Sequence, residues 1–440
     1  MKAGARRTYR GDFMSFRVQL TVEEQRMLSG DSGIAKMKAL QFIAQYADAV
    51  GADRLVEIKK AQIFIGAHHY LRTITSNDID EVIAEMYLNT SDRVVLEKLS
   101  CFTQTDTTPL DPENWQKLGI SREQYELDGR YRQRFRQAGA AEGGSCAAYM
   151  IGFIPMMGEH YVSTESHALL FMNSMWGARA NADSIEASIC SAVCGRTPLW
   201  GNHLTEKRRG THQILIDADP STVHDWDLLG FAIGERIPSN AVPVLVGEFL
   251  PPDLERLKSC FAAMATSGSV EMCHIVGLTP EAPTLEAAFQ NCVPQETITI
   301  TRNELADVSQ RISQQGRAKV GFVSLGCPHY SLKQIQDVAV WLHGKKVNPN
   351  VIFQVWTALP IKTSAARSGF VQEIERAGGS VLTSTCPLVS QTVPDVPAMA
   401  FDSLKQGRYV SACTKARVFI GPVERCLEAA VSGVWTGGMQ

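Results

Sequence analysis

The chain has 440 residues, of which 45% are hydrophobic and 20% charged, and its formal net charge is −3. This composition is ordinary for a globular protein and excludes a disordered chain, a collagen and a coiled coil. The balanced charge gives no electrostatic argument for a nucleic acid or an anionic membrane as partner. The length suggests roughly three domains of about 150 residues each.

The N-terminus and the cysteines indicate the compartment. Residues 1–13 are basic but lack the apolar stretch of a secretory signal. The longest apolar run, Ala147–Gly158, is shorter than the roughly 18 residues that a membrane helix needs. The eleven cysteines are an odd number, which does not fit a disulfide framework. We therefore expect a cytoplasmic protein whose thiols are reduced.

The first 210 residues predict helices around short strands. Thr21 and Glu24 have the spacing of a capping box, which predicts a helix to about Met27. Residues 33–50 carry apolar side chains at helical spacing, and Gly51 follows as a stop. Strands are expected at Leu55–Ile58 and Ala61–Ile65. Residues 111–143 are rich in arginine, but their interspersed acidic residues favour solvated surface helices and a loop over a nucleic-acid patch.

From residue 212 onward, predicted strands alternate with predicted helices, twice over. The first series has strands at His212–Ile216, Val242–Phe249 and Val270–Val276, with helices at Asp225–Ile233 and Asp253–Thr266. The second has strands at 319–325, Asn350–Trp356 and Ser380–Thr383, with helices at Ser331–His343 and Thr363–Ala377. This alternation predicts βαβ units on parallel sheets, an α/β fold, with a seam within 280–304. The expected lobes are 1–210, 211–300 and 301–440.

Three cysteines lie at places where chemistry is expected. Cys327 and Cys386 each directly follow a predicted strand, so both should lie at the carboxyl edge of one parallel sheet, where ligands bind. Cys146 follows a glycine pair that lets the backbone bend. Three thiolates from three turns would suit an iron–sulfur or other thiolate metal site, but spacing alone fits three unrelated buried cysteines equally. Cys190 and Cys194 share a helix face and are expected in the core.

Polar residues are dense in residues 158–208, beside Gly177, Gly195 and Gly201. The segment contains Glu165, Ser166, His167, Asn173, Ser174, Arg179, Asn181, Arg196, His203, Lys207 and Arg208. Two interpretations are open from the pattern alone: loops that converge on a polar pocket, or a helix with a polar face and two loops.

Several longer strings resemble one known family, the large catalytic subunit of aconitase X, over about residues 20–433. They are Asn173-Ser174-x-x-Gly177-Ala178-Arg179-x-Asn181, Gly195-Arg196-Thr197-Pro198-x-x-Gly201-x-His203, Gly326-Cys327-Pro328-His329-x-Ser331, Thr385-Cys386-Pro387 and Ser403-x-Lys405. The resemblance implies an aconitase-like α/β architecture, with several lobes around a central cleft. It also implies a hydro-lyase.

The resemblance further implies a substrate class, a cofactor and a partner. Family members dehydrate cis-3-hydroxy-L-proline or mevalonate 5-phosphate at an iron–sulfur centre. We expect the hydroxyproline, which would yield 1-pyrroline-2-carboxylate, or a related small hydroxy acid; the alternatives are mevalonate 5-phosphate and a non-catalytic or regulatory homologue. At 440 residues the chain is too short for the form fused to a small swivelling domain, so a separate small subunit is expected. The nuclearity of the cluster is left open.

The family's cluster ligands correspond to Cys146, Cys327 and Cys386. An iron that keeps an open position would act as a Lewis acid on the substrate hydroxyl. Arg179 and Asn181 are expected to bind the substrate, with Asn173 and His203 beside them, because Arg offers a bidentate fork. Catalytic roles are assigned to Ser174, Glu165, His329 and Lys405. The base that takes the carbon-bound proton is expected on the missing partner.

The sequence departs from the family pattern at several pocket positions. Ala180 and Ala182 replace a threonine and an arginine, and Ser384 replaces an aspartate. Ser145-Cys-Ala-Ala-Tyr149 lacks a proline, Thr105-Asp-Thr-Thr-Pro109 is altered, and Ser163 stands in place of a tryptophan. The cluster ligands are retained, whereas the exact substrate is left open.

Overall fold

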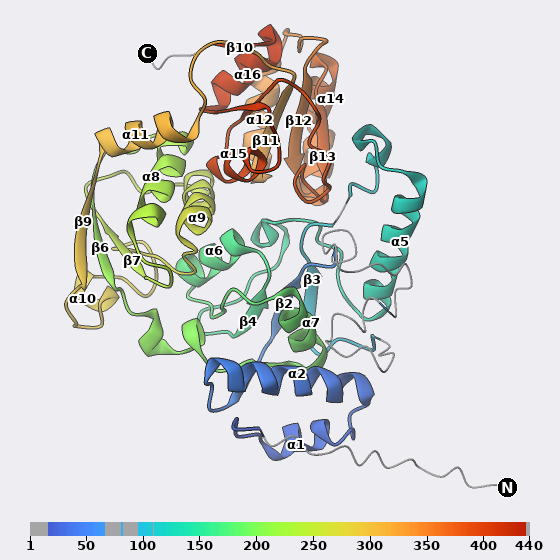
Figure 1. Cartoon of the computed structure of the whole chain (residues 1–440), viewed down its shortest axis with the longest axis vertical. Coiled ribbons are helices and arrows are strands. Elements are labelled where there is room, and N and C mark those ends of the chain that lie inside the picture. The colour runs from blue at the N-terminus through green and yellow to red at the C-terminus, as the bar shows by residue number, and fades with distance from the viewer. Residues whose placement is uncertain (1–15, 67–80, 82–95, 109, 437–440) are drawn as a thin grey trace, which may run out of the picture.

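The computed structural model describes residues 16–66, 81, 96–108 and 110–436. Three regions surround the centre of the molecule: a four-stranded sheet at one side, a five-stranded sheet at the top, and the N-terminal helices below (Figure 1). The basic N-terminus and Pro109 of the sequence analysis lie outside the described residues. No helix in the described ranges is both long and apolar enough to cross a membrane.

The first lobe is built around a parallel three-stranded sheet of order β3-β2-β4, with a separate antiparallel pair β1-β5. The capping box at Thr21 is confirmed, and Gly51 ends α2 in the left-handed conformation, as predicted. The elements are α1 (Val22–Leu28), α2 (Ile34–Val50), β1 (Leu55–Glu57), β2 (Lys60–Ile63), β3 (Phe102–Thr105), α5 (Arg122–Gln137), β4 (Tyr161–Ser163), α6 (Ser166–Trp176), α7 (Ile185–Cys194) and β5 (Arg196–Pro198).

The second lobe contains a parallel four-stranded sheet of order β8-β7-β6-β9. Its elements are β6 (His212–Asp217), α8 (Val223–Arg236), β7 (Pro243–Val246), α9 (Leu254–Gly268), β8 (His274–Ile275), α10 (Leu285–Ala288), β9 (Glu296–Thr301) and α11 (Arg302–Ile312). Strand β9 lies within the segment predicted as a seam and pairs with β6 along its whole length. The sequence prediction missed it, although its buried residues, Ile298 and Ile300, alternate with more exposed ones as in a half-buried strand.

The third lobe is a parallel five-stranded sheet of order β13-β12-β11-β14-β15. Its elements are β10 (Ala318–Lys319), β11 (Phe322–Tyr330), α12 (Leu332–Leu342), β12 (Ile352–Thr357), α13 (Leu359–Arg367), α14 (Phe370–Ala377), β13 (Ser380–Thr383), β14 (Ala398–Phe401), α15 (Leu404–Ser411), β15 (Arg417–Ile420), α16 (Val423–Ser432) and β16 (Val434–Trp435). The predicted helix Thr363–Ala377 is wrong as one element. Gly369, at φ +80°, separates α13 from α14, because a left-handed residue cannot continue a helix.

Strand β11 runs further than predicted and contains Cys327. Its register with β12 breaks between Leu325 and Tyr330, so the backbone leaves the regular ladder at the cysteine. Gly326 makes this path possible: its φ is +101°, and a Cβ there would lie 2.3 Å from the Trp356 carbonyl oxygen. The prediction that Cys327 directly follows a strand is therefore wrong in detail, although Cys327 still lies towards the strand's carboxyl end.

We expect Gly326→Ala to lower the free energy of unfolding by at least about 3 kcal/mol, since it combines a strained φ with a backbone clash. Gly369→Ala is the matched control, because Gly369 also has a positive φ but nothing lies within 4 Å of its Cβ position. That control should cost about 1 kcal/mol. Urea unfolding of the two variants measures the difference. Equal losses would contradict the close approach of β11 to β12.

The carboxyl ends of the first and third sheets meet. The backbone N–H of Thr108, which follows β3, donates to the Ser384 carbonyl, which follows β13, at 2.7 Å. The Thr108 hydroxyl donates to the same carbonyl at 3.2 Å. From beyond β3, the Asp111 carboxylate accepts from the backbone N–H of Thr383 at 2.9 Å. These bonds join the edges at which ligand-binding residues are expected.

Candidate active site

The structure brings the three selected cysteines together at this junction. Cys146 comes from the first lobe, on a loop whose Gly143 N–H donates to the Thr105 hydroxyl at the end of β3. Cys327 and Cys386 come from β11 and from the segment after β13, which flank β12. A charge on Cys327 would raise the pKa of Cys146, and a charge on Cys386 would raise the pKa of Cys327.

Partial exposure distinguishes this cysteine trio from the core cysteines. All eleven thiols are free. Each member of the trio is partly exposed, whereas five others are fully buried, namely Cys190, Cys194, Cys260, Cys273 and Cys426. The prediction that Cys190 and Cys194 pack in the core is confirmed. The trio combines a deep position with a path to solvent, which a bound group or substrate requires.

Each thiol of the trio has a hydrogen-bond donor. The His329 backbone N–H lies 3.4 Å from Cys146 Sγ. The Ser403 hydroxyl donates to Cys327, and backbone N–H groups of Leu388 and Val389 donate to Cys386. Burial raises the pKa of all three thiols, that of Cys327 to about 12, while these donors act in the opposite direction. Such donors stabilise sulfur that carries negative charge, as a metal-bound thiolate does.

His329 connects the segments that carry the three cysteines. Its Nε2 donates to the Thr385 carbonyl at 2.9 Å, next to Cys386. Its Nδ1 must then be the acceptor and takes the proton of the Ser145 hydroxyl at 3.1 Å, next to Cys146. Burial lowers the pKa of this ring to about 4, so it is neutral at pH 7. Both ring nitrogens are occupied, which supports a positioning role for His329 rather than the predicted catalytic one.

Beside the thiols, Glu165 and Lys405 form a close ion pair. Lys405 Nζ lies 2.5 Å from Glu165 Oε1, and His167 Nδ1 lies 2.9 Å from the same oxygen. Burial opposes ionisation of Glu165, but Lys405 and His167 hold the pKa of that carboxyl well below its usual range. Burial likewise acts to lower the pKa of Lys405, but Glu165 and then the thiolates raise it well above normal. Glu165 is therefore a carboxylate and Lys405 an ammonium at neutral pH.

Asp106 is a neighbour that sequence reasoning missed. It follows β3 as Glu165 follows β4, so both carboxyl groups leave the sheet at the same edge. Its side chain is buried and accepts the Thr107 N–H at 2.5 Å. Burial and the charge of Glu165 raise the pKa of Asp106 well above its usual range. Its place after a strand was a signal in the sequence, but the strand at 102–105 was not predicted.

The donor set of the cysteine trio is all sulfur, which is the kind of ligand that holds an iron–sulfur cluster. Across the described ranges, no three His, Cys, Asp or Glu side chains lie close enough together to hold one metal ion. The trio is all sulfur, and each sulfur has a donor. These residues therefore fit a thiolate-bound cluster.

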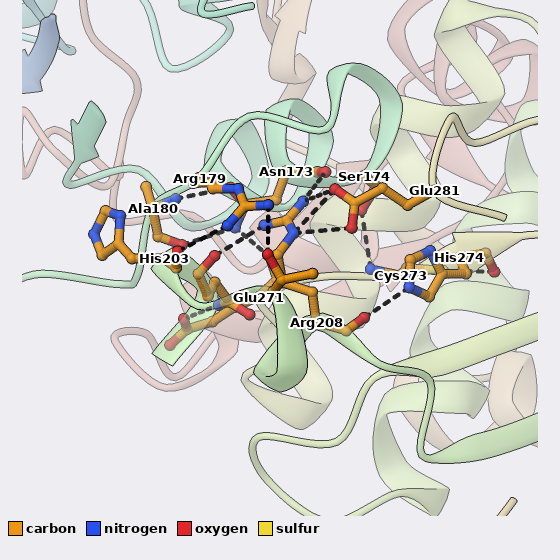
Figure 2. A network of polar contacts seen from close by, with 12 residues as sticks. Asn173, Ser174, Arg179, Ala180, His203, Arg208, Glu271, Cys273, His274 and Glu281 are labelled. Carbon is orange, nitrogen blue, oxygen red and sulfur yellow. Dashed lines mark hydrogen bonds and ion pairs between the residues drawn. The ribbon is translucent and has the colours of Figure 1, made fainter. Parts of the chain in front are cut away.

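The other predicted site residues belong to a second group, centred on buried Arg208 (Figure 2). Arg208 Nη2 lies 2.6 Å from Glu281 Oε1 and donates to the Asn173 carbonyl at 3.0 Å. The Asn173 side-chain amide donates to the carbonyls of Ala180 and Glu271, at 2.9 and 3.0 Å. These contacts hold α6 to its neighbours, so they support a structural role for Asn173.

Ser174 and Asn181 are also bonded to backbone groups. The Ser174 hydroxyl accepts from the Cys273 N–H at 2.9 Å (Figure 2). Asn181 accepts from the Asn202 N–H at 2.7 Å and donates to the Trp200 carbonyl at 3.1 Å. None of these bonds involves the cysteine trio. The catalytic role of Ser174 and the substrate role of Asn181 stay predictions that their surroundings do not support.

Arg179 and His203 line a cavity of about 830 Å³, which no member of the cysteine trio lines. Arg179 donates to the His203 carbonyl at 3.0 Å and to the Thr205 hydroxyl at 2.9 Å. His203 Nδ1 lies 3.0 Å from His160 Nδ1, and burial lowers the pKa of His203 well below its usual range. The structure thus divides the predicted residues into a thiol group and an arginine group.

Comparison with known proteins decides the family. The chain matches three domain profiles: Aconitase X first domain over residues 17–206, second domain over 210–310 and third domain over 320–432. The chain belongs to the aconitase X family. This α/β protein superposes on the crystal structure of Thermococcus kodakaraensis aconitase X (holo-form) with a TM-score of 0.79, at 26% identity over 94% of this chain and 100% of that one.

Curated aconitase X relatives have two kinds of name. Cis-3-hydroxy-L-proline dehydratase of Pseudomonas aeruginosa is 29% identical over 431 residues, 96% of this chain and 71% of that protein. The phosphomevalonate dehydratase large subunit of Methanocaldococcus jannaschii is 29% identical over 417 residues, 93% of this chain and 99% of that subunit. Both names denote dehydratases, so the chain belongs to a family of hydro-lyases, and the predicted fold and reaction class are confirmed.

Proposed function

We propose that this aconitase X protein is an iron–sulfur dehydratase in which Cys146, Cys327 and Cys386 bind the cluster. The observation that carries the proposal is the convergence of three partly exposed thiols, each with a hydrogen-bond donor. The adjacent Lys405–Glu165 pair supplies fixed charges at the same place. A cytoplasmic location stays a prediction.

We propose cis-3-hydroxy-L-proline, or a closely related hydroxylated imino acid, as the substrate. Lys405, beside the thiols, is paired with Glu165, and Asp106 adds a second carboxyl group there. The arginines of residues 158–208 have other partners: Arg196 pairs with Glu23 and Glu24, and Arg208 pairs with Glu281. One ammonium group beside two carboxyl groups favours a substrate that carries a positive nitrogen as well as a carboxylate. It disfavours a phosphorylated acid, which has two anionic groups.

Different residues of this chain would bind the substrate, orient it and donate a proton during the elimination of water. When bound, the cluster would supply an iron that polarises the bond between carbon and the substrate hydroxyl. Lys405 Nζ keeps its proton and binds the substrate carboxylate, while Glu165 orients it. Burial and the charge of Glu165 raise the pKa of Asp106, which favours its protonated form, and this form would donate its proton to the departing hydroxyl, which leaves as water.

A separate small subunit remains part of the proposal. The Methanocaldococcus relative that this chain covers almost entirely is named a large subunit. The Pseudomonas relative is longer, and 71% of it is covered. The proton on the adjacent carbon is taken by a base on that partner, as the family resemblance implies.

We expect the protein, co-expressed with its small partner and purified without oxygen, to release one water from cis-3-hydroxy-L-proline. Mass spectrometry of the product measures the loss, and mevalonate 5-phosphate is the parallel substrate. Turnover of the phosphate alone would contradict the imino-acid assignment. Bound iron with turnover of neither compound would favour a non-catalytic homologue.

A further inference from the structure

The turn that leads to Cys386 has a strained backbone. Strand β13 ends at Thr383, and Ser384 follows with a φ of +69°, in the left-handed region that serine rarely adopts. The Thr385 N–H donates back to the Thr383 carbonyl at 2.8 Å, so the chain bends sharply just before Cys386. A left-handed residue other than glycine persists only where its surroundings hold it, and such residues are concentrated at functional sites.

Hydrogen bonds from the first lobe hold this turn. Asp111 Oδ2 accepts from the Thr383 N–H at 2.9 Å. The N–H and the hydroxyl of Thr108 donate to the Ser384 carbonyl at 2.7 and 3.2 Å. The first bond lies before the Ser384 Cα in the chain and the other two lie after it. Together they fix the backbone on both sides of the strained residue.

Asp111 is itself held in place. Its side chain is fully buried, and its Oδ1 accepts from the backbone N–H groups of Glu113 and Asn114 at 2.8 and 3.0 Å. Its Oδ2 accepts from the Asn114 side-chain amide at 3.0 Å in addition to the Thr383 N–H. Hydrogen bonds to a carboxylate are stronger than those between neutral groups. Both oxygens therefore have defined donors, and Asp111 gives the turn a fixed point of attachment.

Apolar packing joins the same two segments independently of Asp111. The segment after Asp111 and strands β12 and β13 share one buried cluster, made of Leu110, Leu118, Ile120, Trp356 and Leu382. This packing does not involve the carboxylate. Loss of the carboxylate should therefore release the turn while the two lobes stay in contact.

We propose that Asp111 is a positioning residue of the thiol site, which holds the strained turn that presents Cys386. The first lobe would then carry Cys146 and also set the position of a cysteine of the third lobe. Gly144 supports this link, because it packs so closely on the turn that a Cβ there would lie 3.2 Å from the Ser384 Cα. The binding of iron by Cys386 rests on the proposed function, whereas the position of its thiol does not.

The first test is the iodoacetamide alkylation rate of each cysteine in the reduced, metal-free full chain, read by peptide mass spectrometry. We expect Cys386 to react at least about tenfold faster in Asp111→Ala, because release of the turn exposes its thiol. Cys327 and Cys146 should react as in the wild type, since the His329 N–H still joins their segments. An unchanged rate at Cys386, or an equal increase at all three cysteines, would overturn the proposal.

Two further variants guard this test. Asp111→Asn keeps the shape of the side chain but turns an amide NH2 towards N–H donors in either orientation, so it should also speed Cys386 and serves if the alanine variant does not fold. Asp48→Ala is the matched control. Asp48 likewise accepts backbone N–H groups of a distant segment, those of Arg17 and Val18 at 3.0 and 2.8 Å, and its loss should leave Cys386 unchanged.

Glycine at position 384 distinguishes support of the strained turn from a general effect on lobe contact. Glycine adopts a positive φ without steric cost, so the turn of Ser384→Gly needs less support. We expect Ser384→Gly to return the Cys386 rate of Asp111→Asn to near the wild-type value. Ser384→Ala removes the same hydroxyl but keeps the strain, so it should not. Failure of glycine to rescue, or equal rescue by alanine, would overturn the proposal.

The second test is the rate at which a chelator removes iron from the reconstituted protein. Asp111→Asn should lose iron faster than the wild type, and added Ser384→Gly should slow the loss again. Equal rates in wild type and Asp111→Asn would overturn the part that concerns the cluster. If the wild type binds no iron, the proposed function fails, whereas the alkylation rates still decide the role of Asp111.

Discussion

Replacement of Cys327 by alanine is expected to remove bound iron and to lower dehydration at least about a thousandfold. Cys327 interacts electrostatically with both other thiols, since it acts on the pKa of Cys146 and Cys386 acts on its own pKa. Loss of this ligand would remove the iron that polarises the substrate hydroxyl, an effect of several kcal/mol, and each 1.36 kcal/mol is tenfold in rate. Iron content and the rate of water loss are the two measurements.

Cys101→Ala is the matched control for this prediction. Cys101 is partly exposed like the trio, but its sulfur contacts the Thr103 hydroxyl at 3.8 Å, before the carboxyl end of β3. Burial raises the pKa of Cys101 to about 11, so it is also a protonated thiol. The control should keep both iron and activity. Full iron binding by the Cys327 variant would refute the ligand assignment.

Lys405→Met is expected to lower the free energy of unfolding by about 3 kcal/mol at pH 7 and to abolish substrate binding. The change leaves the Glu165 carboxylate largely buried without its partner, which is more costly than loss of the whole pair. The two side chains are 13% and 17% exposed, so solvent screens them little. Unfolding by urea and substrate calorimetry measure the two effects.

The stability loss of Lys405→Met should depend on pH. Lys405 holds the pKa of Glu165 below its usual range in the folded wild type. The carboxylate therefore contributes stability above its unfolded pKa of about 4.3, and this contribution decreases as the pH falls below that value. The difference between wild type and variant should be largest near pH 7 and smaller at pH 4. Glu165→Gln added to Lys405→Met should recover part of the loss.

Lys60→Met is the control for Lys405→Met, because it separates an effect on stability from an effect on substrate binding. Lys60 Nζ pairs with Glu159 at 2.5 Å, with similar burial, but Lys60 begins β2 whereas the thiols lie at the carboxyl edge of that sheet. We expect Lys60→Met to lower stability and leave substrate binding intact. Equal loss of binding in both variants would show that the Lys405 effect reflects general destabilisation.

Local chemistry explains which elements the sequence predicts well. The capping box at Thr21 and the left-handed Gly51 act within a few residues, so pattern reasoning finds α1 and α2. Strands β14 and β15 were not predicted, although each pairs in the same parallel sheet as β11. No local signal in the sequence marks them, and their pairing with β11 and with each other forms only in the folded chain.

In the candidate site too, residues with a local sequence signal were predicted, and residues whose role depends on distant contacts were not. Cys327 and Cys386 were found because they lie at the ends of predicted strands, and turn placement together with a glycine pair selected Cys146. Asp106 was missed, because its importance arises from its interaction with Glu165, which comes from a distant segment of the chain. The polar residues around Arg208 look like a pocket in the sequence, but many of them bond to one another and to backbone groups.

Protection of cysteines by bound iron tests the cluster assignment most directly. The protein reconstituted with iron and sulfide without oxygen is treated with iodoacetamide before and after chelation, and each cysteine is quantified by mass spectrometry. We predict that Cys146, Cys327 and Cys386 are protected while iron is bound and become modified after its removal, with Cys101 labelled equally in both states. Equal labelling of the trio with and without iron would contradict the account.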